Sequence, residues 1–551
     1  MNSPPQAQHD AAFMNSVPSD DEEDPEPPEH TRMSSCTCST VTKFLLQGSF
    51  CFFLFKGFVW LFAIGAAISQ MSQTKAKRVC NVLSQGASGF GDDTVALQRV
   101  LDDASCAEVI FPSNYSFAAS TLIVQRSHVT LTLQPNARLV GLPAAFLLLR
   151  PDCATEEGLE FNWRSWCALL RVTAASNFTL RGPGTIAPGG VGGRRPDFYS
   201  ALHVRSTSGV VLAGVRVHCT AWWWCAVMHN ASQVHVSNGF IDGSTGRDGL
   251  DLVNCRHVRI DDSRIEGSDD ALCLKTINNG GLGRYPSHNI TVVNTSIGST
   301  WCNGIQLGSA TEVDMYAYSF RDVRIGFARK AALSIVSMDG AHISNVNFTN
   351  ITIAGADVAT PIFVKLGNRA ACEDRKGTCA QPGSIRDITF SNVSATGWGN
   401  VSHPKPGHAR AYTATIEGLN ASYRVGPLRL SGLTLDAPGG GSAADALTNP
   451  PISPLAYQPR MDDVRPAYGL FMRYARDVTI TASSVAVTAG REDGRPAMVA
   501  DSVEGFLMDR VRVGDPDGSA VPCQVEARNS SGNWTEGGGV RACVWTPSTD
   551  G

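Results

Sequence analysis

The feature that most constrains this fold is a repeated pattern of short strands that begins near residue 120. In each copy, a stretch of alternating apolar residues is followed by Asn, Ser or Gly and then by a second alternating stretch, as in residues 201–217 and 249–265. Copies begin at Ala201, Ala226, Gly249, Ala271, Gly304, Ala332 and Pro361. The spacing varies between 22 and 33 residues, so the strands recur while the loops differ in length. A repeat of this size indicates a solenoid.

The alternation within each strand indicates one buried and one exposed face, as for Leu250 and Leu252. Short strands that stack like on like at this period predict an all-β fold, a single-stranded right-handed parallel β-helix. A β-sandwich or propeller is the alternative, but it would show hairpin turns and periods of about 40–50 residues. We expect Asn at the corners, because Asn tolerates left-handed conformations. Helical periodicity is confined to residues 94–104, which we expect to cap the N-terminal end.

Four segments are expected along the chain. Residues 1–43 should form a disordered acidic, Pro-rich tail, because residues 1–30 carry eight acids and no Lys or Arg. Residues 44–69 are apolar and predict either a transmembrane signal anchor or a late signal peptide. Either segment directs the chain to the secretory pathway, as a single-pass membrane protein with a lumenal β-helix or as a secreted protein. The β-helix is expected over 78–515, followed by a disulfide-bearing extension over 516–551.

Cysteine use agrees with an oxidising compartment. The chain has sixteen Cys, thirteen of them from Cys80 onward, so at least one of these thiols stays free. Three pairs would close short loops as disulfides do: Cys153 with Cys167, Cys372 with Cys379 and Cys523 with Cys543. Twelve N-x-S/T sequons also fit a secreted glycoprotein. Because no CxxC with a nearby His completes a zinc set, we expect neither a metal nor a cofactor.

Charge excludes one broad class of function. The net charge is −4, and without the eight acids of the tail the chain has 46 basic and 42 acidic residues, a net +4. A general nucleic-acid binder is therefore not expected. A charge of +4 is compatible with a polyanionic glycan but too small to argue for one.

One block of acidic residues suggests chemistry. Asp248 and Asp270 are 22 residues apart, which is one coil of the repeat, so they should stack on neighbouring coils ~4.8 Å apart, with Asp269 beside them. Three carboxylates on one patch repel each other and raise at least one pKa. Glycoside hydrolysis gives a reason to accept that cost, because it needs one acid and another carboxylate to activate water. The alternative is an ordinary turn, which is our interpretation of Asp261-Asp262.

The wider block resembles a known family. Residues 80–104 and 110–141 resemble the N-terminal part of pectin-degrading β-helix enzymes. Residues 247–276 resemble the central catalytic block of the polygalacturonase-like glycoside hydrolases. In that family the block contains an Asn-Thr-Asp-Gly motif followed by a Gly-Asp-Asp motif. Residues 466–474 and 493–505 resemble features of a bacterial-type branch. The resemblance spans roughly 80–515 and implies a pectin-lyase-like solenoid that hydrolyses pectic or related cell-wall polysaccharide with inversion.

The resemblance also assigns roles to the carboxylates. It makes Asp269 the general acid, and it makes Asp248 and Asp270 the residues that hold and activate water. By alternation, Ala271, Cys273, Lys275 and Asp269 should share the outer face. Asp270 can join them only if the chain kinks or bulges at the Asp pair.

Two motifs of the family are altered. Its Gly-His-Gly should fall at residues 302–309, where Asn303 replaces the His, and its Arg-Ile-Lys should fall near residues 333–337, where neither basic residue is present. In polygalacturonases these basic residues receive the carboxylate of galacturonate. Their absence argues against strict homogalacturonan specificity and for another linkage or a less acidic chain.

Further residues are candidates for sugar binding. Besides Asn303, the set consists of Lys275, Arg247, Lys365 and Arg369. The alternative for these basic residues is a solvated side chain or a surface salt bridge. His229 is more readily interpreted as a structural His. Sugar stacking is also open to several Trp residues, half of which should instead point into the core: Trp163, Trp166, Trp222, Trp223, Trp224 and Trp301.

We therefore expect a polygalacturonase-like O-glycosyl hydrolase whose partner is a polysaccharide. We also expect a monomer, attached to a membrane through residues 44–69 if that segment is not cleaved. Two alternatives remain open. One is a catalytically inactive β-helix that binds polysaccharide, and the other is a lyase or epimerase, for which the Asp pair would coordinate Ca²⁺.

Overall fold

The computed structural model describes most of the chain from residue 78 onward. The described ranges are 78–142, 167–188, 199–219, 224–278, 285–355, 357–369, 381–399, 412–459, 464–489, 491–514, 524–534 and 542–545. All lie in the compact unit Lys75–Gly551. The expected tail and the apolar segment 44–69 lie outside these ranges. Within them, no helix is long and apolar enough to cross a membrane.

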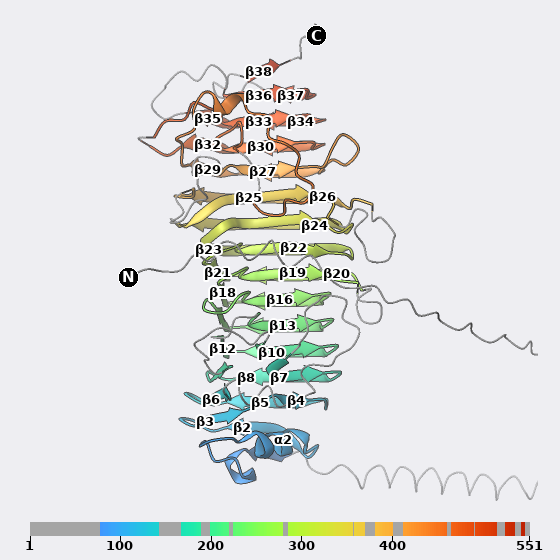
Figure 1. Ribbon diagram of the computed structural model, residues 1–551, viewed down its shortest axis with the longest axis vertical. Helices are drawn as coiled ribbons and strands as arrows, with labels where there is room; N and C mark the ends of the chain where they lie inside the picture. The colour runs from blue at the N-terminus through green and yellow to red at the C-terminus, as the bar shows by residue number, and fades with distance from the viewer. Residues whose placement is uncertain are drawn as a thin grey trace, which may run out of the picture. The chain divides into compact units, whose positions relative to one another are not determined.

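The described residues form a right-handed parallel β-helix, which confirms the predicted fold (Figure 1). A coil contains three strands, such as β13 (Ala226–His229), β14 (Ser232–Ser237) and β15 (Phe240–Gly243). Each strand pairs in parallel with its counterparts on the preceding and following coils. The strands therefore stack into three sheets that run along the solenoid.

The three sheets are named here by the order of their strands within a coil. The first sheet contains β4 (Leu122–Val124), β7 (Cys167–Thr173), β10 (Tyr199–Arg205), β13, β16 (Leu250–Val253), β19 (Leu272–Thr276), β22 (Ile305–Thr311), β25 (Val358–Leu366), β27 (Ala414–Glu417), β30 (Leu470–Arg473), β33 (Met498–Asp501), β36 (Val525–Arg528) and β38 (Ala542–Trp545). The second contains β1 (Arg78–Asn81), β2 (Cys106–Phe111), β5 (Val129–Leu133), β8 (Ser176–Arg181), β11 (Ser208–Ala213), β14, β17 (Arg256–Asp261), β20 (Ser287–Val293), β28 (Leu428–Ser431), β31 (Val478–Thr481), β34 (Phe506–Asp509) and β37 (Gly532–Trp534). The third contains β3 (Ser116–Ala119), β6 (Arg138–Gly141), β9 (Thr185–Ala187), β12 (Arg216–His218), β15, β18 (Arg264–Gly267), β21 (Ser296–Ser299), β29 (Thr434–Ala437), β32 (Ser484–Val487) and β35 (Arg512–Gly514).

Three long strands turn corners and take part in more than one sheet. These are β23 (Met315–Ser337), β24 (His342–Ala354) and β26 (Ser384–Thr396). In β23, the final residues join the first sheet between β22 and β25. Short 3₁₀ turns occur at η1 (Leu83–Gln85) and η3 (Asp445–Leu447).

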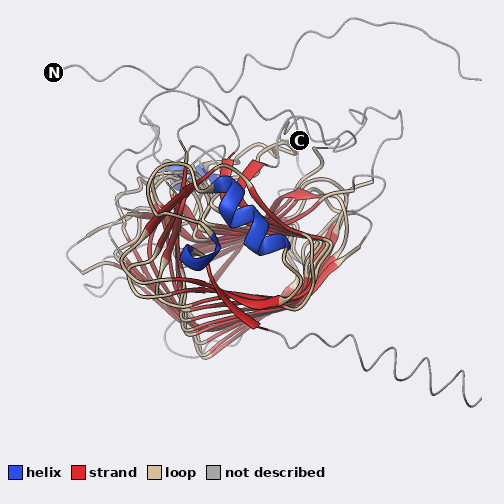
Figure 2. Cartoon of the chain, turned by 90° about the horizontal axis from the view of Figure 1, so that it is seen from below, coloured by secondary structure: helices blue, strands red, loops and turns tan. Residues whose placement is uncertain are grey.

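A helix closes the N-terminal end, as predicted. Helix α2 (Thr94–Asp102) lies across the opening of the solenoid in the end-on view (Figure 2). It buries Leu97 and Leu101 against the first coil. Its Gln98 side chain exchanges hydrogen bonds of 2.8 and 2.9 Å with the backbone of Ile123. These bonds satisfy strand groups that would otherwise form an exposed edge.

Asn residues occupy the corners between strands, also as predicted. Asn254, Asn289 and Asn350 have positive φ values of 50°, 55° and 55°. Side chains stack from coil to coil, and the Asn392 amide donates to Asn350 Oδ1 at 3.2 Å. The tolerance of Asn for left-handed backbone thus fixes where each coil turns.

At a second corner, just before the first-sheet strand β16, there is no room for a side chain at Gly249. A Cβ on Gly249 would approach the carbonyl oxygens of Glu266 and Ala271 to 2.5 and 2.6 Å. Ala271 itself lies in the core beside Leu272, so its predicted outward position is wrong. The alternation breaks there because the chain turns a corner between the two core residues. The same break allows Asp270 to face outward, as the kink hypothesis required.

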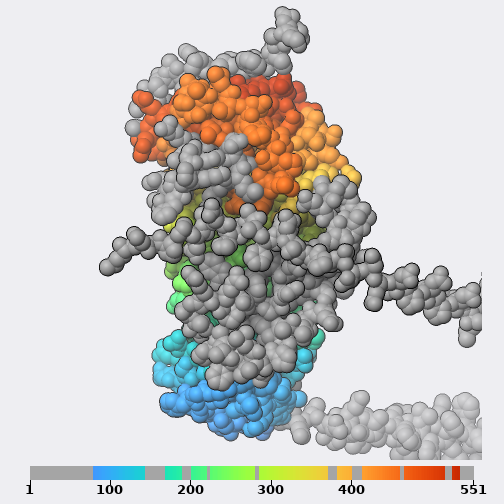
Figure 3. Space-filling model, viewed as in Figure 1, coloured from blue at the N-terminus to red at the C-terminus, as the bar shows by residue number. Residues whose placement is uncertain are grey.

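The solenoid continues to the C-terminal coils, which are orange and red in Figure 3. Strands β36 and β38 extend the first sheet past residue 515, where an extension was expected to begin. Two disulfides lie among the described residues, Cys80–Cys106 and Cys219–Cys225. The three pairs expected from the sequence lie outside the described residues or include side chains that are not described. Cys255, Cys273 and Cys302 are buried free thiols, which agrees with the expectation that at least one thiol stays free.

Candidate active site

The corner before the first sheet brings the predicted carboxylates together. Asp269 N–H donates to Arg247 O at 3.0 Å, and Gly249 N–H donates to Asp270 O at 2.9 Å. Arg247 and Asp248 therefore lie one coil below Asp269 and Asp270. On the following coil, Ala271 N–H donates to Asn303 O at 3.0 Å. All three predicted catalytic residues lie at this corner together with Asn303.

Asp248 is held by a buried lysine. Lys275 Nζ donates to Asp248 Oδ2 at 2.7 Å and also contacts Asp251 Oδ1. The Lys275 ammonium lies 4.0 Å from the centroid of the Trp224 ring, and its side chain is 12% exposed. Burial lowers the pKa of Lys275, but the carboxylates of Asp248 and Asp251 outweigh burial and raise it. Lys275 thus faces outward as predicted, but it binds carboxylates of the protein.

Asp270 is held by Asn303. Its Oδ1 accepts hydrogen bonds from the Asn303 side-chain amide at 2.8 Å and from the Asn303 backbone N–H at 3.1 Å. Its backbone N–H donates to Asp248 Oδ1 at 3.3 Å, and Cys273 Sγ lies 3.4 Å from its Oδ2. Burial raises the pKa of Asp270 to about 6, and the carboxylates of Asp248 and Asp269 add to the effect. Near neutral pH this carboxyl therefore exchanges protons readily.

Asp269 has the opposite electrostatics. Arg247 Nε and Nη2 contact its Oδ2 at 3.2 and 2.5 Å. Burial raises the pKa of Asp269, but the charges of Arg247 and Lys330 outweigh burial and lower it to about 2. Two adjacent carboxyls thus have pKa values that are pushed apart, a pattern that acid–base sites show. Asp269 is therefore ionised at neutral pH.

Two groups of ligand-capable atoms occur here. The carboxylates of Asp248 and Asp251 lie within 4.8 Å of each other and of Cys273 Sγ, and Asp269 and Asp270 form a similar group with Cys302. In the first group the Lys275 ammonium already bridges the two carboxylates. In the second, Arg247 and Lys330 supply the compensating charge. A cation would have to compete with these groups, so we interpret both as ion-pair clusters.

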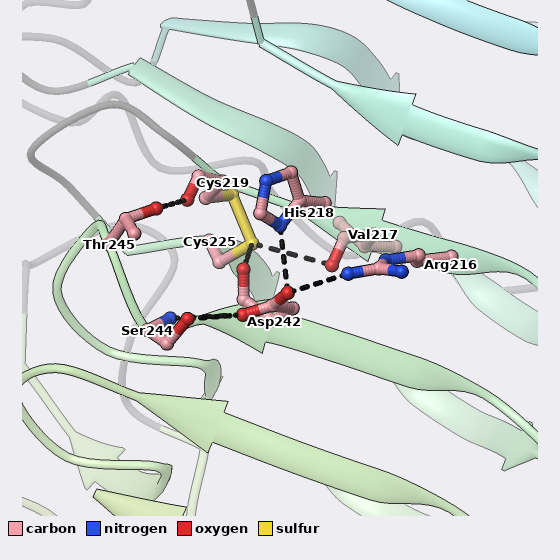
Figure 4. The surroundings of a disulfide bond; sticks show 8 residues. All are labelled: Arg216, Val217, His218, Cys219, Cys225, Asp242, Ser244 and Thr245. Atoms are coloured by element: carbon pink, nitrogen blue, oxygen red, sulfur yellow. Dashed lines mark hydrogen bonds and ion pairs between the residues drawn. A yellow bond between two sulfur atoms is a disulfide. The ribbon is translucent and has the colours of Figure 1, made fainter. Parts of the chain in front are cut away.

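A disulfide braces the coil below Asp248 (Figure 4). Cys225, bonded to Cys219, donates its backbone N–H to Asp248 O at 2.8 Å. The Thr245 hydroxyl donates to Cys219 O at 2.6 Å. The disulfide therefore restrains Cys225, whose backbone N–H is hydrogen-bonded to the backbone of Asp248.

Other predicted residues lie away from the carboxylates or are buried. Lys365 is 1% exposed and donates to Glu417 Oε2 at 2.6 Å, so it is a buried ion-pair residue. Arg369 is 34% exposed and contacts both oxygens of Asp339, at 2.9 and 2.6 Å. His229 is fully buried, and burial lowers its pKa to about 4, which fits a structural His.

Two of the six Trp candidates lie among the described residues, and neither belongs to the main hydrophobic core cluster. Trp224 is buried over Lys275. Trp301 is 50% exposed, and the Arg329 guanidinium lies 4.5 Å from its ring centroid. The remaining four Trp candidates lie outside the described residues.

Sequence reasoning missed Asp251 and Lys330. Asp251 is fully buried and shares Lys275 with Asp248, while Lys330 is 8% exposed and faces Asp269, Asp270 and Cys302. A signal for Lys330 was available. Lys330 stands two residues before the repeat start at Ala332. Arg247 and Asp269 likewise stand two residues before the repeat starts that follow them.

Comparison with known proteins supports the family resemblance. Residues 196–403 match the model of glycosyl hydrolases family 28. This segment contains every catalytic residue that the sequence predicted, and the resemblance to the polygalacturonase-like hydrolases is thereby confirmed. No curated protein matches the chain.

Solved structures share the fold at low sequence identity. An exopolygalacturonase from Thermotoga maritima has a TM-score of 0.50 and 15% identity, over 78% of this chain and 92% of that one. A family 28 exopolygalacturonase from Yersinia enterocolitica has a TM-score of 0.49 and 15% identity, over 82% and 78%. A polygalacturonase from Erwinia carotovora has a TM-score of 0.39 and 12% identity, over 85% and 97%. Identity this low shows the fold alone.

Proposed function

We propose that this protein is an inverting glycoside hydrolase that cleaves a pectic or related cell-wall polysaccharide with Asp248, Asp269 and Asp270. The observation that carries the proposal is the group of three carboxylates at one corner of the residues that match the family 28 model. An ordinary turn has no need for this arrangement, because buried like charges cost stability. Acid–base hydrolysis needs it.

The geometry divides the work among the side chains. Asp269 is the proposed general acid, as the family resemblance implies, and it protonates the oxygen of the glycosidic bond as that bond breaks. Asp248 and Asp270 hold the attacking water and receive its proton. Lys275 fixes Asp248, and Asn303 fixes Asp270 through two donors on one oxygen. Asn303 is therefore a positioning residue, in the place where the family has His.

The altered basic motif bears on the substrate. Ser334 lies on the first sheet at the expected position of the Arg-Ile-Lys motif, fully buried and without a charge. Arg247 and Lys330 supply cations at the corner instead. We therefore propose a sugar chain whose binding differs from that of a strict homogalacturonan substrate.

The proposed location is the secretory route or the cell exterior. The two disulfides support it, because such bonds persist in oxidising compartments. The membrane anchor expected at residues 44–69 stays a prediction.

A glycan panel tests the proposed activity. Purified full-length protein is incubated with pectic, rhamnogalacturonan and algal glycans, and new reducing ends are counted. The expected result is reducing ends without an ultraviolet-absorbing unsaturated product, with the anomeric configuration of the first product inverted in NMR spectra. Absence of cleavage with retained binding would identify a polysaccharide-binding protein. An unsaturated product lost on chelation would identify a lyase.

A further inference from the structure

Arg247 and the proposed acid Asp269 form an ion pair at the corner before the first sheet. Two nitrogens of the guanidinium contact one oxygen of Asp269, at 3.2 and 2.5 Å. Both side chains are partly accessible, at 31% and 26%. The family motif described above has Thr where this chain has Arg247, so the motif does not require this contact.

The ion pair conflicts with the chemistry that Asp269 must perform. A general acid has to hold a proton at the working pH. The charged groups that face Asp269 are Arg247 and Asp248 from the coil below, Asp270 beside it, and Cys302 and Lys330 from the coils above. Burial raises the pKa of Asp269, but the charges of Arg247 and Lys330 outweigh burial and lower it to about 2. While Arg247 stays in place, Asp269 has almost no proton to give at neutral pH.

We propose that Arg247 is a positioning residue that holds Asp269 as a carboxylate before substrate binds and releases it when an anionic group of the bound sugar chain pairs with the guanidinium. This inference rests on the proposed hydrolase function. Neutral hydroxyls are poor competitors for a guanidinium that already binds a carboxylate with two donors. A carboxylate on the sugar chain can accept hydrogen bonds from the same two guanidinium donors. Arg247 thereby links recognition of the substrate's charge to the protonation of Asp269.

When Arg247 pairs with the substrate, Asp269 is released and takes one proton from solvent. It passes that proton to the glycosidic oxygen as the bond between that oxygen and the anomeric carbon breaks. Water adds to the anomeric carbon and gives one proton to the carboxylate pair of Asp248 and Asp270, which releases that proton to solvent when the product leaves. Asp269 returns to its carboxylate form and pairs with Arg247 again when the product leaves.

Proton uptake on binding tests the inference without requiring turnover. Calorimetric titration of the full chain at pH 5 in two buffers of different ionisation enthalpy measures the protons bound per ligand. The probes are tri-galacturonate and its neutral counterpart galactotriose. We expect the wild type to take up close to one proton with tri-galacturonate and none with galactotriose, and Asp269→Asn to take up none. Tri-galacturonate that binds without proton uptake overturns the inference. If the wild type does not bind tri-galacturonate, the titration uses the acidic glycan of the panel that it binds best, and binding of that glycan without proton uptake overturns the inference.

Variants of Arg247 separate release from simple structural support. Arg247→Gln should bind tri-galacturonate about tenfold more weakly and take up less than half the protons, because Asp269 is already unpaired. Arg247→Lys should recover part of both effects, which a purely structural role does not explain. Arg259→Gln is the matched control, since Arg259 pairs with Asp261 at 2.8 Å on the second sheet and is 54% exposed. Equal proton uptake in wild type and Arg247→Gln contradicts the inference.

Failure of the Arg247 inference can be distinguished from failure of the hydrolase proposal. A wild type that cleaves a glycan but takes up no proton on binding keeps its hydrolase function, and the Arg247 inference fails. A wild type that takes up the proton but cleaves nothing keeps the Arg247 inference, and the hydrolase function fails. In an active enzyme, the alkaline limb of kcat should lie at higher pH than that of kcat/KM, because the two report the bound and free states. The two limbs should converge in Arg247→Gln.

Discussion

The corner around Asp270 and the C-terminal coils around Glu417 both place charged residues on the outer side of the first sheet. In the C-terminal coils the charges alternate from coil to coil and form a charge ladder of Lys365, Glu417, Arg473, Asp501 and Arg528. Glu417 is fully buried and has Lys365 at 2.6 Å and Arg473 at 3.8 Å on either side. In the ladder, a carboxylate lies between cations.

The corner has the opposite order. Asp248 and Asp270 are neighbours on adjacent coils, and the Asp270 N–H lies 3.3 Å from Asp248 Oδ1. Asp269 adds a third carboxylate beside them. The same sheet thus carries a region where neighbouring charges attract and one where they repel. The difference shows that the repulsion at the corner is local and is not forced by the fold.

Neutralising Asp270 should have the largest effect and should stabilise the protein. Asn keeps the oxygen that accepts from Asn303 and removes the repulsion, so Asp270→Asn should cut kcat by about 10²–10⁴-fold. The pKa of Asp270 is 3.8 in the unfolded chain and about 6 in the folded protein. The wild type therefore loses stability as the pH rises through this range, and the loss persists above pH 6. The variant should therefore gain about 2–3 kcal/mol above pH 6 and little below pH 4. Denaturant unfolding at pH 4 and pH 7 measures the gain.

A variant that loses activity and also stability at pH 7 contradicts the repulsion account. Asp262→Asn is the matched control, because Asp262 also ends an Asp pair and has a positive φ of 49° that Asn accepts. It should change neither kcat nor the pH dependence of unfolding.

Neutralising Glu417 should have the opposite sign. Glu417→Gln leaves Lys365 and Arg473 buried beside a neutral group, which should cost about 3–5 kcal/mol. Burial raises the pKa of Glu417, but Lys365, Arg465 and Arg473 outweigh burial and lower it. Its contribution to stability is therefore present above the unfolded pKa and lost as pH falls through the folded one. Denaturant unfolding between pH 7 and pH 3 should show this loss in the wild type and not in Glu417→Gln.

An exposed pair calibrates that result. Glu266→Gln removes a partner of Arg264, whose side chain is 58% exposed, and should cost less than about 1 kcal/mol. If Glu417→Gln costs no more than Glu266→Gln, the ladder does not stabilise the C-terminal coils.

Removing the Asn303 side chain should weaken catalysis more than stability. Asn303→Ala deletes the 2.8 Å hydrogen bond to Asp270 and the acceptor for Ala331 N–H at 3.1 Å. A hydrogen bond to a charged group contributes about 1.5–3 kcal/mol, so kcat/KM should fall about ten- to hundredfold. Steady-state kinetics measure it, with Asn347→Ala on β24 as the control. An unchanged kcat/KM would remove Asn303 from the site.

The smallest expected effect concerns the disulfide brace. Replacing Cys219 and Cys225 together by Ser should cost about 2 kcal/mol of stability and lower kcat several-fold, because Cys225 supports Asp248 through its backbone. Replacing Cys80 and Cys106 should lower stability while leaving kcat of the folded protein unchanged. Equal effects of the two double variants on kcat would show that the brace does not position Asp248.

The fold and the grouping of the three carboxylates were predictable because both follow the period of the repeat. Counting back from the repeat starts aligns Asp248 with Asp270, and alternation places Lys275 on the outer face. The prediction that Ala271 faces outward was wrong because simple alternation takes no account of a corner. At this corner two successive residues, Ala271 and Leu272, both point into the core. Asn303 was predicted to bind substrate, yet its amide contacts Asp270.

The charge partners could not be predicted from the local pattern. Lys365 has the sequence of an exposed strand lysine, but its partner Glu417 is 52 residues away. The pairing of Arg247 with Asp269 depends on which rotamers reach across one coil, which spacing alone does not specify. The pKa of Asp269 therefore became apparent only from the structure.

The most direct test of the central claim compares Asp269→Asn with Asp262→Asn on the glycan that the wild type cleaves best. Each variant neutralises one member of an Asp pair, one at the corner and one at an exposed turn. The measurement is kcat from the release of reducing ends, with unfolding curves to show that both variants are folded. We predict that Asp269→Asn loses about 10²-fold or more while Asp262→Asn keeps wild-type turnover. Turnover by Asp269→Asn equal to that of Asp262→Asn would contradict the assignment of the corner as an acid–base site.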